Sequence, residues 1–400
     1  MAVCIKSIRS FSQAIRKSLH LGIRENTKLK NWGLKHEKTL LQSISNKKTK
    51  FYKLAVIGSG SWASAIARIV GHNARHNDLF DETVMMYVRQ RIFKGEKLTD
   101  IINSQHENPC YLPGFKLPDN IFAVSDVVEA ARNSDIIIFV MPHKFVKQTC
   151  TPLIGQIKPY SIGVSLIKSF DVDDSGEIRL VSDWLRKNLN IDVSVLMGAN
   201  IAHEVAAEFL CEATLGTYDE QVGNILKQLF ETDYFKVTMS TDLSTIELCG
   251  ALKNIVALAS GCVDGLGYGN NTKAAVIRLG LTEMIKFAQW FYPKAKLETF
   301  FQSCGVADLL TTCYGGRNRR LAEAFVRTRQ KLNELEAEML EGQKLQGPET
   351  ADAVHRVLKK QNLEEHFPLF VVVNKIFTGQ LPPTELITCV RHHPQFRNLV

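Results

Sequence analysis

Residues 53–75 join a short apolar run, a glycine-rich turn and a helical pattern without a break. Residues 53–57 have the apolar, β-branched composition of a buried parallel strand. Apolar residues at helical spacing follow the turn. This order of strand, turn and helix predicts a Rossmann-like unit, because it is the context that the G-x-G-x-x-G/A fingerprint requires. The fingerprint consists of Gly58, Ser59, Gly60, Ser61, Trp62 and Ala63.

The small residues of this turn each have a physical task. Gly58 allows the tight turn, Gly60 lets a pyrophosphate approach the backbone, and Ala63 keeps the helix close to the strand. The helix N-terminus offers free N–H groups and the positive end of its dipole to phosphates. We therefore predict that residues 58–63 bind a dinucleotide. The alternative is a glycine turn with a purely structural role in an α/β fold that binds no cofactor.

Further strand-like runs alternate with helical patterns, and the spacing between successive runs is typical of βαβ units. This order predicts a mostly parallel sheet. The ligands of such sheets bind beyond the carboxyl ends of the strands. That rule singles out the residues just past each predicted strand, namely Gly58–Trp62, Arg89, Met141–Phe145, Lys168 and Gly198–Ile201. The predicted strands are residues 53–57, 83–88, 121–124, 134–140, 162–167 and 193–197.

From residue 242 onward the pattern is helical, with little that resembles a strand. The predicted fold class is therefore α/β: a Rossmann-like, mostly parallel sheet domain at 51–241, followed by an all-helical C-terminal domain at 242–400. The predicted helices of the second domain are residues 246–259, 273–291, 319–331, 351–360 and 370–377.

Residues 1–50 differ in charge from the rest of the chain. Their Lys and Arg residues are numerous, whereas Glu25 and Glu37 are their only acids. The net charge of +8 therefore lies in this extension, and the remainder of the chain is close to neutral. The amphipathic, acid-poor start is typical of an organellar transit peptide, and a solvated, disordered extension is the alternative. We expect a cytoplasmic protein, or a mitochondrial one if residues 1–50 act as a transit peptide.

Composition argues against several classes of function. A nearly neutral body does not favour nucleic-acid binding, and we find no run of 18 or more apolar residues that predicts a membrane span. The 9 cysteines form no Cys-x-x-Cys pair, and the 11 histidines form no His-Glu-x-x-His pattern. We expect free thiols in a reducing compartment and no metal site.

Two charged residues of the predicted helical domain lie within apolar sequence, namely Lys253 and Asp308. A buried charge is costly unless it is paired, so such residues are often functional. Lys253 could instead extend to the surface, and Asp308 could cap a helix. A desolvated lysine near other cations has a lowered pKa, which suits it to protonate the alkoxide formed by hydride transfer to a carbonyl. We assign Lys253 this role, with Lys168 as a second cation and Asp308 as the orienting group.

A glycine turn with concentrated positive charge begins at Gly315. Arginine forks match phosphate oxygens, so Arg317 with Asn318 is a candidate clamp for a substrate phosphate. The alternative is an exposed, basic helix start without a ligand.

Seven motifs, in this order, resemble the cytosolic NAD-dependent glycerol-3-phosphate dehydrogenase family. The resemblance extends from about residue 52 to residue 396. The motifs are Gly-Ser-Gly-Ser-Trp-Ala-Ser-Ala-Ile-Ala (58–67), Ser-Leu-Ile-Lys (165–168), Leu-Met-Gly-Ala-Asn-Ile-Ala (196–202), Cys-Gly-Ala-Leu-Lys-Asn (249–254), Gly-Val-Ala-Asp-Leu (305–309), Cys-Tyr-Gly-Gly-Arg-Asn (313–318) and Gly-Gln-Lys-Leu-Gln-Gly-Pro-Glu (342–349).

The resemblance implies the reversible, NAD-linked interconversion of dihydroxyacetone phosphate and sn-glycerol 3-phosphate by a homodimer. It implies that Lys253 is the proton donor and acceptor, with Lys168 and Asp308 beside it. The implied substrate-binding residues are Lys168, Asn254, Thr312, Arg317 and Asn318. Besides residues 58–63, the implied cofactor-binding residues are Phe145, Ala202, Arg317, Lys344 and Gln346.

The chain departs from this family at two positions. Ala63 replaces the usual glycine, which the general fingerprint tolerates, and Arg89 replaces an aromatic residue beside the adenosine. An arginine after the second strand can accept a 2′-phosphate, and no carboxylate follows until Glu96. We expect NAD as the cofactor, with NADP used less well. A 3-hydroxyacyl- or 6-phosphogluconate-type dehydrogenase, or a catalytically silent nucleotide-sensing protein, is the alternative function.

Overall fold

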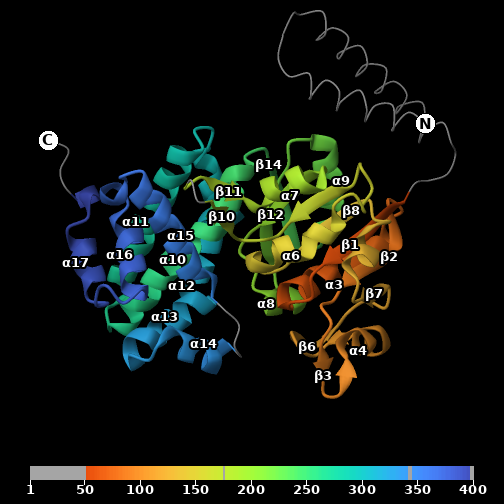
Figure 1. The fold of residues 1–400 in the computed structure, drawn as a ribbon, viewed down its shortest axis with the longest axis horizontal. Helices are drawn as coiled ribbons and strands as arrows, with labels where there is room; N and C mark the ends of the chain where they lie inside the picture. The colour runs from red at the N-terminus through yellow and green to blue at the C-terminus, as the bar shows by residue number, and fades with distance from the viewer. Residues whose placement is uncertain (1–50, 174–175, 341–344, 397–400) are drawn as a thin grey trace, which may run out of the picture. The chain divides into compact units, whose positions relative to one another are not determined.

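A computed structural model describes residues 51–173, 176–340 and 345–396. In it, the glycine-rich turn joins strand β1 (Tyr52–Ile57) to helix α3 (Ser61–His76), as the sequence predicts. β1 lies inside an eight-stranded sheet of order β14-β13-β12-β9-β8-β1-β2-β7 (Figure 1). The other strands are β2 (Phe80–Tyr87), β7 (Ile121–Val124), β8 (Ile136–Phe139), β9 (Ile162–Ser165), β12 (Asp192–Met197), β13 (Cys211–Gly216) and β14 (Phe235–Ser240).

All neighbouring strands of this sheet are parallel except β12 and β13, which pair antiparallel. The mostly parallel sheet is thereby confirmed. The sequence analysis missed β13 and β14. Their segments contain Glu212, Thr214, Lys236 and Thr238, so neither has the continuous apolar run that marks a doubly covered parallel strand.

Helices cover both faces of the sheet, and alternate residues of β1 point to opposite faces. Leu54 and Val56 pack with α3 in one core, whereas Ala55 and Ile57 pack in another. The helices connecting the strands are α4 (Leu98–Gln105), α5 (Val127–Ala131), α6 (Val146–Cys150), α7 (Val181–Leu189), α8 (Ala202–Ala206) and α9 (Glu220–Phe230), with the short turn η1 (His143–Phe145) before α6.

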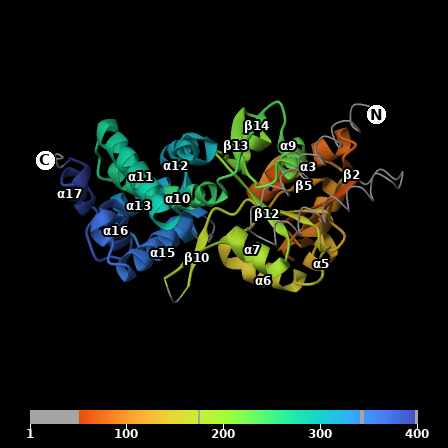
Figure 2. The ribbon, with the colours of Figure 1, turned by 90° about the horizontal axis from the view of Figure 1, so that it is seen from above.

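The helical part of the chain is built around α10 (Leu243–Gly265), which packs against several other helices of this part and against β12 (Figures 1 and 2). This helix is long and apolar enough to cross a membrane by length and composition, although Glu247 and Lys253 interrupt its apolar run. Its whole apolar window is nevertheless buried inside the protein, as in the core helix of a soluble fold. The other helices are α11 (Asn270–Phe291), α12 (Asp308–Gly315), α13 (Arg317–Thr328), α14 (Leu332–Leu340), α15 (Gln346–Lys360), α16 (Pro368–Phe377) and α17 (Glu385–Arg391), with the turns η3 (Leu297–Phe301) and η4 (Ser303–Ala307) before α12.

The predicted helices of this part are all present, with starts that lie two to five residues earlier in the structure. Three small hairpins extend from the strand-bearing part, formed by β3 (Ile92–Phe93) with β4 (Glu96–Lys97), β5 (Glu107–Asn108) with β6 (Leu112–Lys116), and β10 (Phe170–Val172) with β11 (Ile178–Leu180).

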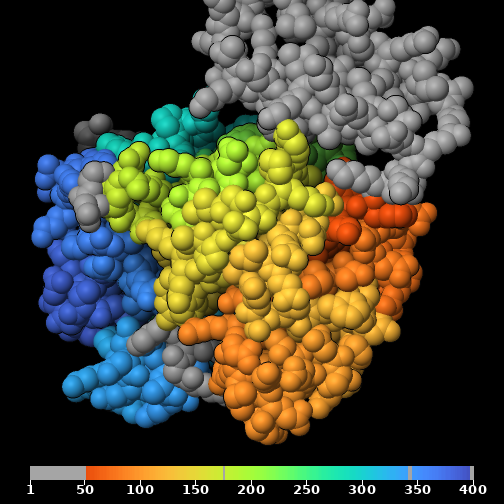
Figure 3. Space-filling view, turned by 45° about the vertical axis from the view of Figure 1, so that its right-hand side comes forward, coloured from red at the N-terminus to blue at the C-terminus, as the bar shows by residue number. Residues whose placement is uncertain are grey.

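The sheet ends at Ser240 and α10 begins at Leu243, so the structure follows the predicted fold class of a sheet part and then a helical part. In the space-filling view the surfaces of the two parts adjoin directly (Figure 3). The assignment of separate domains at 51–241 and 242–400 stays a prediction. Residues 1–50 lie outside the described residues, so both interpretations of that extension stay open.

Candidate active site

The glycine turn after β1 has the geometry that a bound pyrophosphate requires. Gly58 has φ +137°, and a Cβ there would lie 1.9 Å from the carbonyl oxygen of Val140, so only glycine fits. A Cβ on Gly60 would meet nothing within 4 Å, which leaves open space in front of the backbone. The first turn of α3 has no side-chain cap and no acid. Its N–H groups are thus available to an anion, and the turn fits a dinucleotide.

Neighbouring side chains fix the path of this turn. Ala63 is buried against Gly58, which explains why alanine serves at the third fingerprint position. Asn108, which the sequence analysis missed, donates Nδ2 to the carbonyl oxygen of Ser59 and to the Oγ of Ser64, both at 2.9 Å. The Ser61 hydroxyl donates to the carbonyl oxygen of Tyr111 at 2.6 Å. A single asparagine before a proline gives no sequence signal that Asn108 holds the glycine turn.

Lys253, Lys168 and Asp308 come together although they lie far apart in the sequence. Lys253 is on α10, Lys168 follows β9, and Asp308 begins α12. The Lys168 Nζ lies 2.8 Å from Asp308 Oδ2, and the Lys253 Nζ donates a short hydrogen bond to Asp308 Oδ1. Lys253 also donates to the Thr312 Oγ1 at 2.7 Å. The structure therefore brings the three predicted catalytic residues and Thr312 into one cluster.

Burial determines the chemistry of Lys253. Its exposed fraction is 6%, and that of Asp308 is 2%. Desolvation, opposed by the charge of Asp308 and reinforced by that of Lys168, lowers the pKa of Lys253 to about 7. Both the ammonium and the amine forms of Lys253 are therefore populated near neutral pH. A group in this state can donate or accept a proton without a large cost.

A turn after β12 supports Lys168 from the opposite side. Lys168 Nζ donates to the carbonyl oxygen of Gly198 at 2.8 Å. Ser303 holds this turn, because its Oγ accepts from the N–H of Ala199 at 3.3 Å and donates to the carbonyl oxygen of Glu212 at 2.6 Å. The sequence analysis missed Ser303, since a serine between Gln302 and Cys304 carries no distinguishing pattern.

Asn254 and Asn318 connect three helices next to this cluster. Asn318 donates Nδ2 to the Asn254 Oδ1 at 2.8 Å, and its Oδ1 accepts from the N–H of Gly347 at 3.0 Å. This chain joins α10, α13 and the start of α15. Arg317 is the first residue of α13, whose N-cap, Gly316, provides no side-chain cap. Desolvation, followed by the charge of Arg320, lowers the pKa of Arg317.

The remaining predicted cofactor residues lie in separate loops. Phe145 ends η1 after β8, Ala202 begins α8 after β12, and Gln346 begins α15. Lys344 lies outside the described residues. Arg89, just after β2, has its guanidinium carbon 5.3 Å from the centroid of the Phe145 ring.

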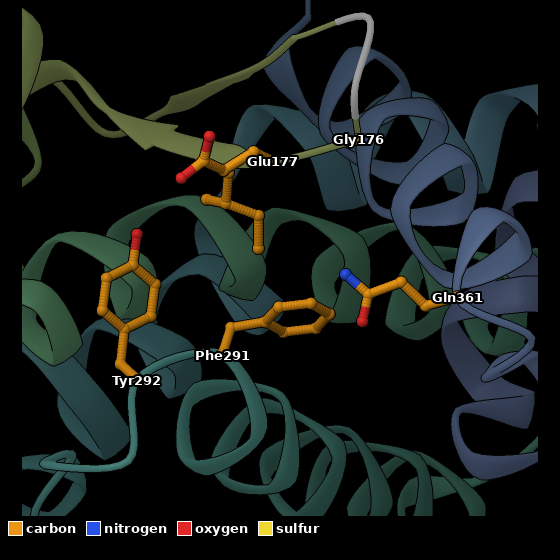
Figure 4. Close-up of a pocket in the computed structure, with 6 residues that line it drawn as sticks. Gly176, Glu177, Phe291, Tyr292 and Gln361 are labelled. Carbon is orange, nitrogen blue, oxygen red and sulfur yellow. The ribbon is translucent and has the colours of Figure 1, made fainter.

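A pocket of about 280 Å³ lies elsewhere, between the β10–β11 hairpin and the ends of α11 and α15 (Figure 4). None of the predicted site residues lines it. Its lining residues are Gly176, Glu177, Ile178, Phe291, Tyr292 and Gln361. Among the described residues, no group of three or more His, Cys, Asp or Glu side chains could hold a metal ion.

Comparison with known proteins assigns both parts of the chain. Residues 53–223 match the family described as NAD-dependent glycerol-3-phosphate dehydrogenase N-terminus, and residues 242–388 match its C-terminus. The chain is 55% identical over 342 residues to the cytoplasmic glycerol-3-phosphate dehydrogenase (NAD+) of Drosophila melanogaster, covering 86% of this chain and 94% of that protein.

Two further similarities agree with this assignment. The cytoplasmic glycerol-3-phosphate dehydrogenase (NAD+) of Rattus norvegicus is 52% identical over 344 residues, which cover 86% of this chain and 98% of that protein. The solved structure of Plasmodium falciparum glycerol-3-phosphate dehydrogenase has a TM-score of 0.81 and 38% identity, covering 88% of this chain and 96% of that one.

Proposed function

The chain belongs to the NAD-dependent glycerol-3-phosphate dehydrogenase family, and from this premise we propose how its own residues catalyse the reaction. The reaction is the reversible, NAD-linked interconversion of dihydroxyacetone phosphate and sn-glycerol 3-phosphate. The observation that carries the proposal is the buried cluster of Lys253, Asp308 and Lys168, which provides a proton donor of suitable pKa.

When bound, the nicotinamide cofactor supplies or accepts the hydride. In the direction of ketone reduction, Lys253 in its ammonium form donates a proton to the oxygen of the developing alkoxide. In the reverse direction its amine takes the hydroxyl proton. A pKa of about 7 serves both directions, because neither protonation state is strongly disfavoured near neutral pH.

Asp308 and Lys168 prepare this group for proton transfer. Asp308 holds each lysine through a different carboxylate oxygen, so it fixes the position of Lys253 and compensates for the positive charges of both lysines. Lys168 adds a positive charge near the carbonyl, which stabilises negative charge on the substrate oxygen. Thr312 accepts a hydrogen bond from Lys253 and donates one to the Asp308 carbonyl oxygen at 2.6 Å. Together with the bond to Asp308, it fixes the orientation of the Lys253 ammonium group.

The uncapped start of α13 is the proposed phosphate site. Arg317 offers a planar fork of donors, and the positive end of the helix dipole favours an anion there. The second Nδ2 proton of Asn318 adds a donor, since its Oδ1 and the other proton serve Gly347 and Asn254. A phosphate bound at this helix start anchors one end of the substrate, which orients its carbonyl for reaction with Lys253.

For the cofactor, we propose that residues 58–63 bind the pyrophosphate and that Phe145, Ala202, Arg317 and Gln346 contact the rest of the dinucleotide. We also propose a homodimer in the cytoplasm, the compartment that the names of the relatives give. Size-exclusion chromatography with light scattering tests the dimer. A fluorescent fusion of residues 1–50 tests the compartment, and a mitochondrial signal would contradict it.

The direct test of the reaction is NADH oxidation by the purified full chain with dihydroxyacetone phosphate. We expect turnover, and we expect glycerol 3-phosphate as the product. A catalytically silent nucleotide-binding protein would bind NADH without oxidising it. A 3-hydroxyacyl- or 6-phosphogluconate-type dehydrogenase would oxidise or reduce its own substrate and leave dihydroxyacetone phosphate unchanged. Either result would overturn the proposal.

A further inference from the structure

Arg89 lies where we expect the chain to depart from its family, and the structure shows a partner for it. β2 ends at Tyr87, and Arg89 is exposed two residues later. Its guanidinium carbon lies 5.3 Å from the centroid of the Phe145 ring, within the range of a cation–π contact. β2 and β8 flank β1 in the sheet, so Arg89 and Phe145 approach each other across the glycine turn.

Other cations surround the same position. The Lys144 Nζ lies 5.2 Å from the centroid of the same Phe145 ring. Arg91 donates Nη1 to the Tyr111 hydroxyl at 3.0 Å and lies over that ring at 5.7 Å. The carbonyl oxygen of the same Tyr111 accepts a hydrogen bond from the hydroxyl of Ser61 in the fingerprint. Three cations thus gather beside the glycine turn, each near an aromatic ring.

Two arginines and no acid closely follow β2 in the chain. The chain after Val88 contains no Asp or Glu until Glu96, which is exposed on the short β4 strand. Among the described residues, Arg89 and Lys144 form no ion pair with a carboxylate. An enzyme restricted to NAD commonly has an acid after the second strand, where it binds the ribose 2′-hydroxyl and repels a 2′-phosphate. This chain has the opposite charge at that place.

Phe145 changes what Arg89 can contribute. A free surface arginine gains little from an anion, because it must give up the freedom of a long side chain to bind. A guanidinium held over a ring has lost part of that freedom, and its planar fork can form two hydrogen bonds with one phosphate. Preorganisation of this kind strengthens binding without any new contact.

We propose that Arg89, held over Phe145 and assisted by Arg91 and Lys144, binds the 2′-phosphate of NADP(H). The chain therefore accepts NADP(H) as well as NAD(H) in the reaction proposed above. This inference rests on the proposed dinucleotide site at residues 58–63, which places the adenosine ribose beyond the end of β2.

The first test measures binding without catalysis. By calorimetry, 2′,5′-ADP should bind the full chain roughly tenfold more tightly than 5′-AMP, the size of one or two charge-assisted hydrogen bonds at an exposed site. Arg89→Gln should abolish most of this advantage, and Arg89→Lys should keep a part of it. Arg132→Gln removes an equal charge from an exposed position at the end of α5 and should keep it all. Equal affinity of the unmodified protein for the two nucleotides would overturn the proposal.

The second test measures the ratio of kcat/KM for NADPH to that for NADH. We expect measurable turnover with NADPH, and we expect Arg89→Gln to lower the ratio by roughly tenfold. Rising salt should weaken NADPH more than NADH, because the added contact is electrostatic and exposed. An unchanged ratio in Arg89→Gln would contradict the role of Arg89. If neither cofactor supports turnover while 2′,5′-ADP still binds preferentially, the proposed reaction fails and the 2′-phosphate site stands.

Discussion

At the scale of single residues, the pKa of Lys253 governs how the reaction should depend on pH. Ketone reduction needs the ammonium form, so its rate should fall as pH rises through about 7. Oxidation of the alcohol needs the amine, so its rate should fall as pH drops through the same range. Initial rates in both directions across pH 5–9 measure this. Two profiles with the same slope would contradict Lys253 as the proton donor.

Substitution of Lys253 tests its role as proton donor directly. Lys253→Met should reduce turnover by roughly 10²–10⁴, the usual contribution of a general acid–base group. NADH affinity should change little, because Lys253 lies among Asp308 and Thr312 and not in the glycine turn. Lys187→Met, on the exposed side of α7, is the control. Turnover near that of the unmodified protein would exclude the assignment.

Arg317 should separate substrates by their phosphate group. Arg317→Ala should lower kcat/KM for dihydroxyacetone phosphate by roughly 10–100-fold, the range of a charge-assisted hydrogen bond. Unphosphorylated dihydroxyacetone, which lacks the anion, should be affected much less. Steady-state kinetics with both substrates measure the difference. Equal losses for the two substrates would show that Arg317 does not bind the phosphate.

Sequence reasoning found these residues where a charge stood in apolar sequence or beside glycines, as with Lys253, Asp308 and Arg317. It missed Asn108 and Ser303, whose roles are hydrogen bonds to backbone groups brought close only by the fold. It also had no basis for placing Arg89 over Phe145, because two residues more than fifty positions apart meet only when β2 and β8 flank β1.

At the scale of elements, the two glycines of the fingerprint should respond differently to alanine. Gly58→Ala places a methyl group against the Val140 carbonyl oxygen at a φ that disfavours side chains, so we expect a marked loss of stability or no soluble protein. Gly60→Ala meets no protein atom within 4 Å, so the fold should persist while NADH affinity falls. Thermal melting and calorimetric NADH titration distinguish the two effects. A Gly60→Ala variant that binds NADH normally would argue against a pyrophosphate at this turn.

Helices and strands with a strong apolar pattern could be predicted from the sequence, whereas those with a weak pattern could not. The strong apolar runs of β1 and β8 and the long patterns of α10 and α11 identified those elements correctly. β13 was missed because it pairs antiparallel to β12 near the sheet edge, where tertiary pairing rather than an apolar run makes the strand.

At the scale of the whole molecule, Glu247 links the sheet part to the helical part. It lies on α10, is fully buried, and accepts hydrogen bonds from the N–H and the hydroxyl of Ser182 at the start of α7. Desolvation, opposed by the hydrogen bonds from Ser182 and reinforced by the charge of Asp183, raises the pKa of Glu247 to about 7. The folded protein thus holds this proton to higher pH than the unfolded chain.

The sign of the resulting pH dependence follows from linkage. The stability that the protonated carboxyl provides is complete below pH 4.5, and it is lost as pH rises through about 7. Glu247→Gln is uncharged at every pH, so the free energy of unfolding of the unmodified protein should fall relative to this variant between pH 5 and pH 8, by up to about 3 kcal/mol. Urea denaturation at the two pH values measures the change, with Glu177→Gln as an exposed control. If the difference between Glu247→Gln and the unmodified protein were the same at both pH values, Glu247 would not titrate at this junction. We expect the free energy of unfolding to fall between pH 5 and pH 8 in the unmodified protein and in Glu177→Gln, but not in Glu247→Gln. That result would show that one buried carboxyl makes the contact between the two parts of the molecule pH-dependent.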